Sequence, residues 1–173
     1  MKKLIIGVLL FIFTITLAGC KGIGFHSKIY GTSSNYLKKE FIDNNPLYDS
    51  KWNGYGDSEK DPDDRTFIVN DKTTFDSMFN ENSIEVDFSK QMVLVYMYVY
   101  VHNNRDLKLK KINYNSTVTT TNNETTSLST LDIEFGTKDT HLKDAQEPSI
   151  HYAIVVMDKL AVDTVTFTHL GLL

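Results

Sequence analysis

The chain has a single cysteine, Cys20, among its 173 residues. An intramolecular disulfide is therefore impossible, although exported domains of this size often contain several. Any folded domain in this sequence has to be stabilised by packing and hydrogen bonding alone.

Long apolar runs are also lacking. The longest apolar segment covers residues 4–17. As a helix it would reach about 21 Å, whereas the hydrocarbon core of a membrane is about 30 Å thick. The segment follows Lys2 and Lys3 and precedes Ala18 and Gly19, an arrangement typical of an export signal. We therefore expect residues 1–19 to be a cleaved signal peptide and not a permanent membrane span.

Clusters of basic residues are scarce. Without residues 1–19 the chain loses two lysines and no acidic residue, which leaves 16 basic and 22 acidic side chains and a net charge of −6. The densest basic stretch is residues 108–111, and Leu109 interrupts it. Proteins that bind nucleic acids carry continuous basic surfaces. The composition therefore argues against a nucleic-acid partner.

Motifs for catalysis or metal binding are missing from the sequence. It contains no nucleophile elbow and no Walker loop, and its five histidines lack the spacing of a helical metal site. A pair of His102 and His151 would supply fewer than the three or four ligands of a structural site. An acidic segment, residues 57–64, has Pro62 and Ile68 where a calcium loop needs glycine and glutamate. We therefore predict no catalytic residue, no metal and no cofactor.

The sequence around the cysteine carries a specific motif. Leu17-Ala18-Gly19-Cys20 resembles the lipobox of bacterial lipoproteins, which signal peptidase II cleaves before a cysteine that carries diacylglycerol. The resemblance implies that Cys20 is the lipid-attachment residue, bearing diacylglycerol and an acyl chain such as palmitate. Acyl chains contribute about 0.8 kcal/mol per buried methylene to membrane binding. The expected location is the cell envelope, outside the cytoplasm, with a membrane anchor through Cys20.

The mature chain is long enough for one domain with its own core. Residues 20–45 begin as a polar stretch and are expected to form a lipid-anchored stalk. Large apolar residues such as Tyr36 and Leu37 predict that some of the irregular structure packs on the domain. Residues 46–173 are expected to form a single β-rich extracytoplasmic domain.

Residues 92–101 give the strongest strand signal, because β-branched and aromatic residues alternate and both faces are apolar. Such a strand is central and covered on both sides. One of its faces carries Tyr96, Tyr98 and Tyr100. This row has two interpretations, a binding face for a glycan, peptide or protein, or core beneath a helix.

Weaker patterns complete the predicted fold. Thr73 and Asp76 have capping-box spacing and predict a short helix over residues 74–81. A change of parity across Lys110 and Lys111 predicts a bulge, and the Thr-rich residues 117–130 predict an exposed hairpin or loop. Further strands are expected at residues 131–136, 150–157 and 162–167, the last two joined by a tight turn. The predicted fold is all-β or β-dominated α+β, an antiparallel sandwich or open barrel with one short helix.

Three of these segments also resemble a known family. They are the helix near residues 73–82, the phrase at residues 86–91 before the central strand, and the late strand after Pro148. Over about 100 residues the chain is similar to the protease-complex-stabilising C-terminal domain of exported bacterial proteins. The resemblance implies a non-enzymatic module that binds another envelope protein. The alternative is a lipoprotein that binds a small ligand, a peptide or a glycan, through the tyrosine row and Trp52.

Overall fold

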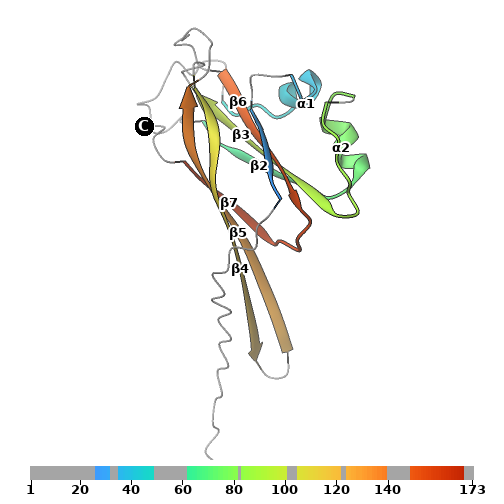
Figure 1. Ribbon diagram of the computed structural model, residues 1–173, viewed down its shortest axis with the longest axis vertical. Coiled ribbons are helices and arrows are strands. Elements are labelled where there is room, and N and C mark those ends of the chain that lie inside the picture. The colour runs from blue at the N-terminus through green and yellow to red at the C-terminus, as the bar shows by residue number, and fades with distance from the viewer. Residues whose placement is uncertain are drawn as a thin grey trace, which may run out of the picture.

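Two β-sheets pack face to face, and two short helices cover the outer face of one of them (Figure 1). The computed structural model describes residues 26–31, 35–48, 62–81, 83–100, 105–121, 124–139 and 149–169. The first sheet has the strand order β1-β6-β3-β2 and the second the order β4-β5-β7. The predicted β-dominated fold is confirmed as an open sandwich and not a closed barrel, with two short helices in the described residues where one was expected and with one parallel strand pair.

The described part of the chain contains seven strands and two helices. In sequence order they are β1 (Lys28–Gly31), α1 (Lys39–Asp43), β2 (Arg65–Val69), α2 (Lys72–Met78), β3 (Gln91–Tyr100), β4 (Arg105–Thr121), β5 (Glu124–Asp139), β6 (Ser149–Asp158) and β7 (Thr164–His169).

The two central strands, β3 and β6, pair antiparallel over their full lengths, from Gln91 opposite Asp158 to Tyr100 opposite Ser149. Nine consecutive residues of β3 are buried, which confirms the prediction of a strand covered on both faces. Its valines face the helices and its tyrosines face the second sheet. Since successive side chains of a strand point to opposite faces, β3 contributes to both cores.

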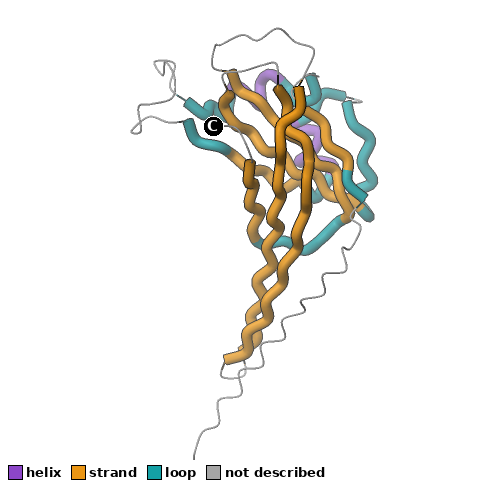
Figure 2. The backbone as a smooth tube through the Cα atoms, turned by 60° about the vertical axis from the view of Figure 1, so that its left-hand side comes forward, coloured by secondary structure: helices purple, strands orange, loops and turns teal. Residues whose placement is uncertain are grey.

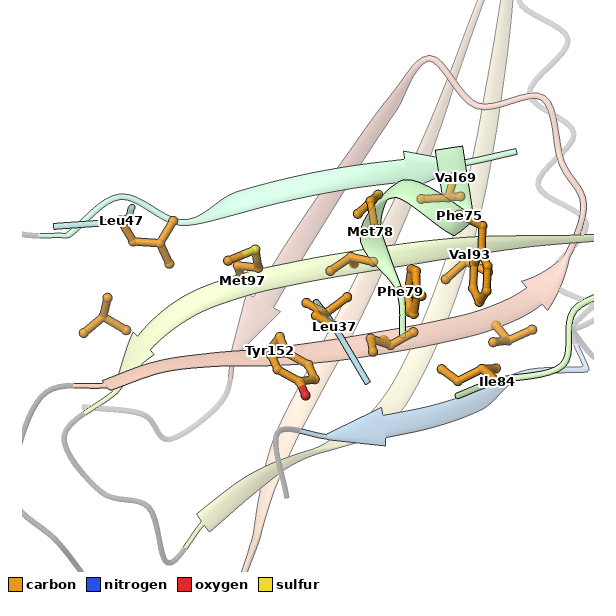
Figure 3. Close-up of a cluster of buried hydrophobic side chains, with 14 residues drawn as sticks. Leu37, Leu47, Val69, Phe75, Met78, Phe79, Ile84, Val93, Met97 and Tyr152 are labelled. Carbon is orange, nitrogen blue, oxygen red and sulfur yellow. The ribbon is translucent and has the colours of Figure 1, made fainter. Parts of the chain in front are cut away.

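The helix-side core forms because α2 presents Phe75 and Met78 to the first sheet (Figure 3). The helix begins two residues earlier and ends three residues earlier than the predicted range, residues 74–81. Its N-cap is Asp71, whose carboxylate accepts a hydrogen bond of 2.8 Å from the Thr74 amide. Thr73 is therefore not the cap. The helix ends at Met78 because Phe79 is extended and forms a β-bridge with Leu37. A tertiary contact thus replaces the last helical turn that the sequence predicted.

Part of the segment that was expected to form a stalk packs on the domain in the structure. β1 pairs antiparallel with β6, and Leu37 is fully buried against the helix-side core. The Lys38 amide donates a 2.8 Å hydrogen bond to the carbonyl of Met78. The described residues between 28 and 45 therefore bury apolar surface on the first sheet.

The last two strands do not form a hairpin, contrary to prediction. Residues 159–163 cross from one sheet to the other, and β7 pairs parallel with β5. The crossing is fixed by Lys159, whose Nζ donates to the carbonyls of Phe88 (2.9 Å) and Asn70 (3.1 Å). Leu160 packs on the core between the sheets. Packing of Leu160 and Val162 on this core therefore favours a crossover over a tight turn.

The β4–β5 hairpin extends well beyond the sandwich (Figure 2). The predicted bulge is confirmed as a register shift between Leu109 and Lys111, and the predicted Thr-rich hairpin is confirmed as the distal part of both strands. We define the arm as residues 115–121 of β4 together with residues 124–129 of β5. β7 pairs with β5 only from Thr130 onward, so the arm is a two-stranded ribbon.

Two leucines on β5 test where the core ends and the arm begins. Leu131 is fully buried, whereas Leu128 is 56% exposed. Leu131→Ala should lower the free energy of unfolding in urea by about 2–5 kcal/mol, because it leaves a cavity. Leu128→Ala, the matched control, should change it by less than about 0.5 kcal/mol. Equal losses in the two variants would contradict this division.

Candidate interaction surface

The tyrosine row predicted as a possible binding face lies inside the molecule. Tyr96, Tyr98 and Tyr100 are only 2%, 4% and 6% exposed and pack between the two sheets. The ring of Tyr96 stacks on Phe167 of β7 at a centroid distance of 4.5 Å. The interpretation of the row as core is therefore the correct one. The layer that covers the row is the second sheet, whereas the sequence predicted a helix there. The row thus offers no ligand a surface in this fold.

The hydroxyl of the buried Tyr96 has a hydrogen-bond partner at the protein surface. It donates a 2.6 Å hydrogen bond to the carboxylate of Asp64, which is exposed just before β2. Buried tyrosine hydroxyls usually find such a partner, since an unpaired one is costly to bury. The role of Asp64 in this contact is to satisfy the hydroxyl of the buried Tyr96.

The other residues considered from the sequence do not form a site. His151 is buried, with its Nε2 2.9 Å from the Ser149 hydroxyl, while His102 lies outside the described residues. Within the described ranges, no group of three or more metal-ligating side chains comes together. Cys20 and Trp52 also lie outside the described residues.

A groove of about 790 Å³ runs between α2 and residues 83–88. Its apolar lining consists of Phe75, Phe79 and Ile84, each of which is at most 8% exposed, and of the half-buried Val86 and Phe88. On its rim, Lys72 forms an ion pair of 2.7 Å with Asp76. Three of these five apolar side chains are already buried and the ion pair neutralises two of the rim charges, so the groove offers a ligand little apolar surface.

The arm is the surface with properties unlike the rest of the described molecule. Its two apolar residues, Val118 and Leu128, are 52% and 56% exposed, and they are the exposed large apolar side chains of the described residues. Two-stranded ribbons without a covering layer are only marginally stable in water. An uncovered ribbon that exposes both of its apolar side chains therefore points to a surface that is covered in use.

The edge of β4 is protected near the body and unprotected along the arm. Exposed lysines 108, 110 and 111 and the bulge line the part beside the body, and both features discourage edge-to-edge pairing. From residue 112 to residue 121 the strand has no charge and no proline. In the described fold no strand pairs with this edge. The protection thus stops close to where the arm begins.

The other edges of the two sheets differ from this one. The edge strands β1, β2 and β7 have four, five and six residues, whereas β4 has seventeen. Short edge strands are a common protection against unwanted pairing. Lys28 also lies 4.7 Å from the ring centre of Tyr30 on β1 and adds a charge to that edge. Among the described edges, the arm is therefore the one best suited to accept another strand.

A hydrogen-bonded junction fixes the base of the arm. The carboxylate of Asp163, at the start of β7, accepts bonds from the Ser129 amide (2.7 Å) and hydroxyl (2.8 Å). In return, the Asp163 amide donates to the Ser129 carbonyl at 3.0 Å. The bond from the Ser129 amide, followed by that from its hydroxyl, holds the pKa of Asp163 below its usual 3.8. Ser129 is the last buried residue before the exposed ribbon.

Comparison with known proteins identifies no relative: no protein-family model, no curated protein and no solved structure matches this chain. Among the described residues, no helix is long and apolar enough to cross a membrane. Any functional argument therefore depends on the residues of the chain itself.

Sequence reasoning found the hairpin but did not identify it as a site. The available signal was the contrast within β4, where lysines end at Lys111 and ten uncharged residues follow. The polar composition of the arm did not mark it as a binding surface, because threonine-rich segments are also typical of solvated loops. The burial of Ser129 and its partner Asp163 could not be read from the sequence, since they are 34 residues apart.

The junction predicts a specific dependence of stability on pH. Because the folded pKa of Asp163 is lowered, its carboxylate stabilises the fold above pH 3.8, and this contribution is lost as the pH falls through the folded pKa. Asp163→Asn should therefore be less stable than the parent at neutral pH. The difference should shrink below pH 3.8 in urea unfolding measured at a series of pH values. A difference that stays constant or widens on acidification would show that the charge has no such role.

Proposed function

We propose that this chain is a lipid-anchored protein of the bacterial cell envelope that binds an envelope protein through its β4–β5 arm. The anchor is Cys20, where the lipobox motif ends. The domain acts by binding and not by catalysis. The acyl chains on Cys20 contact the membrane. The surface of the domain is then available to bind a protein partner.

The observation that carries this proposal is the exposed arm with its unprotected edge. Strands that lack charge, proline and bulges accept an extended segment by forming main-chain hydrogen bonds, a recognition mode known as β-augmentation. Val118 and Leu128, on opposite faces of the ribbon, would bury apolar surface when a partner covers them. The partner segment is therefore expected to be extended, uncharged and rich in β-branched residues.

The alternative function, binding of a peptide or glycan by the tyrosine row, loses its basis. It required Tyr96, Tyr98 and Tyr100 to line an accessible surface, and the second sheet buries all three. The groove beside α2 does not replace them, because most of its apolar side chains are already buried. We therefore do not propose a small-molecule site.

The anchor is tested by changing the lipobox cysteine. Cys20→Ser should move the protein from the membrane fraction to the soluble or unprocessed pool, because no thiol remains to be acylated. Mass spectrometry of the native protein should find Cys20 as an amino-terminal residue that carries diacylglycerol. Ser27→Ala, a change of similar size beyond the motif, is the control and should leave the protein in the membrane. An unmodified Cys20 thiol in the native protein would rule out the anchor.

The arm is tested by shortening it without disturbing the body. Ser116 pairs with Ser129, so replacing residues 117–128 by Asn-Gly should close the hairpin with a tight two-residue turn. The shortened protein should keep its thermal midpoint within a few degrees and its membrane attachment. In cells, the yield of partner cross-linked to the shortened protein should be at least about tenfold lower than the yield with the full-length protein. A tenfold loss in affinity corresponds to about 1.4 kcal/mol. Unchanged cross-linking would place the binding surface elsewhere.

A further inference from the structure

We infer that the partner of the arm is the arm of a second copy of this chain, paired β4 edge to β4 edge about a two-fold axis. The inference rests on the proposed function, since it names the protein that the arm binds. Homo-oligomers most often form around such an axis, where one surface meets its own copy.

The sequence of the arm suits pairing with itself. If Val118 lies on the axis, it faces Val118 of the second copy, and the antiparallel register places Thr117 opposite Thr119. Cross-strand pairs of β-branched and hydroxyl side chains of this kind stabilise sheets. The same register keeps all seven residues from 115 to 121 opposite uncharged partners. No like charges therefore meet at the interface, and the half-exposed Val118 becomes covered.

Charge also favours this geometry over contact between the bodies. The chain has a net charge of −4, and of −6 without residues 1–19, so two bodies repel each other. The seven arm residues of β4 span about 23 Å at about 3.3 Å per residue. This distance is more than twice the screening length of about 8 Å at physiological salt. Antiparallel arms can thus meet while the acidic bodies stay electrostatically apart.

The size of the contact indicates where the dimer forms. Stable interfaces bury about 800 Å² on each partner, more than two seven-residue strands provide when they lie edge to edge. The pairing is therefore weak in dilute solution. Anchoring both copies to one membrane raises their effective concentration and makes such a contact productive.

Cysteine cross-linking in cells tests this register directly. If Cys20 is acylated, Val118→Cys introduces the one free thiol of the chain. Opposed residues in antiparallel strands lie close enough for a disulfide. Mild oxidation should therefore give a disulfide-linked dimer of Val118→Cys, which a reducing agent converts back to monomer. Thr166→Cys, an exposed strand position on β7, is the matched control and should give at least about tenfold less dimer.

Charge exchange then identifies the partner. In the Val118→Cys background, Thr117→Lys with Thr119→Lys should reduce the dimer at least about tenfold, because four like charges meet. Thr117→Glu with Thr119→Glu should do the same. Co-expression of the two variants, each with its own epitope tag, should restore the mixed dimer, since opposite charges now face each other. The same substitutions at Thr164 and Thr166, outside the arm, should have no effect.

The possible results separate the inference from the proposed function. Restoration in the mixed sample establishes pairing between copies. A Val118→Cys product whose mass is that of the chain plus a different protein would overturn the second copy as partner but support the arm as a binding surface. Absence of any Val118→Cys dimer in membranes would overturn pairing between copies, whereas the proposed function would be overturned by unchanged cross-linking of the protein with the shortened arm. A dimer in the parent protein through Cys20 itself would instead reveal an unacylated thiol and refute the anchor alone.

Discussion

The antiparallel pairing of β3 with β6 is the contact on which the rest of the molecule depends. These strands are the only pair among the described elements that is buried on both faces over most of its length. One face receives the helices and Leu37, and the other receives the second sheet. Since the chain has one cysteine, no disulfide supports this arrangement. Removal of apolar surface from water on both faces has to provide the main stabilisation.

The features that a local pattern could predict are those whose cause is local. β3 has apolar residues on both faces, and the parity change at Lys110 marks the bulge, so both followed from the sequence. The N-cap was missed by two residues, because both Asp71 and Thr73 can cap and the structure uses Asp71, whose carboxylate accepts from the Thr74 amide. The helix end was missed because it depends on Phe79 bridging to Leu37. Parallel pairing of β7 with β5 joins segments that are distant in sequence, and no period reveals it.

The tyrosine row shows why a candidate site was harder to predict than the fold. Alternation correctly placed Tyr96, Tyr98 and Tyr100 on one face of β3, yet a row of aromatic residues looks the same whether a sheet covers it or not. Only the position of the second sheet decides that question. The arm has the opposite character. Its sequence is unremarkable as a loop, and it becomes a candidate surface once its strands are seen to continue past β7.

Body and arm therefore divide two physical tasks. The body buries its large apolar side chains and limits its other edges by short strands, while the arm leaves a long edge and two apolar side chains open. Hydrogen exchange of the β4 amides at residues 115–121 tests this division most directly, with the acylated protein compared in membranes and in dilute detergent. The account predicts strong protection of these amides in membranes and rapid exchange in detergent, with equal protection of β3 in both. Rapid exchange along the arm in both conditions would contradict it.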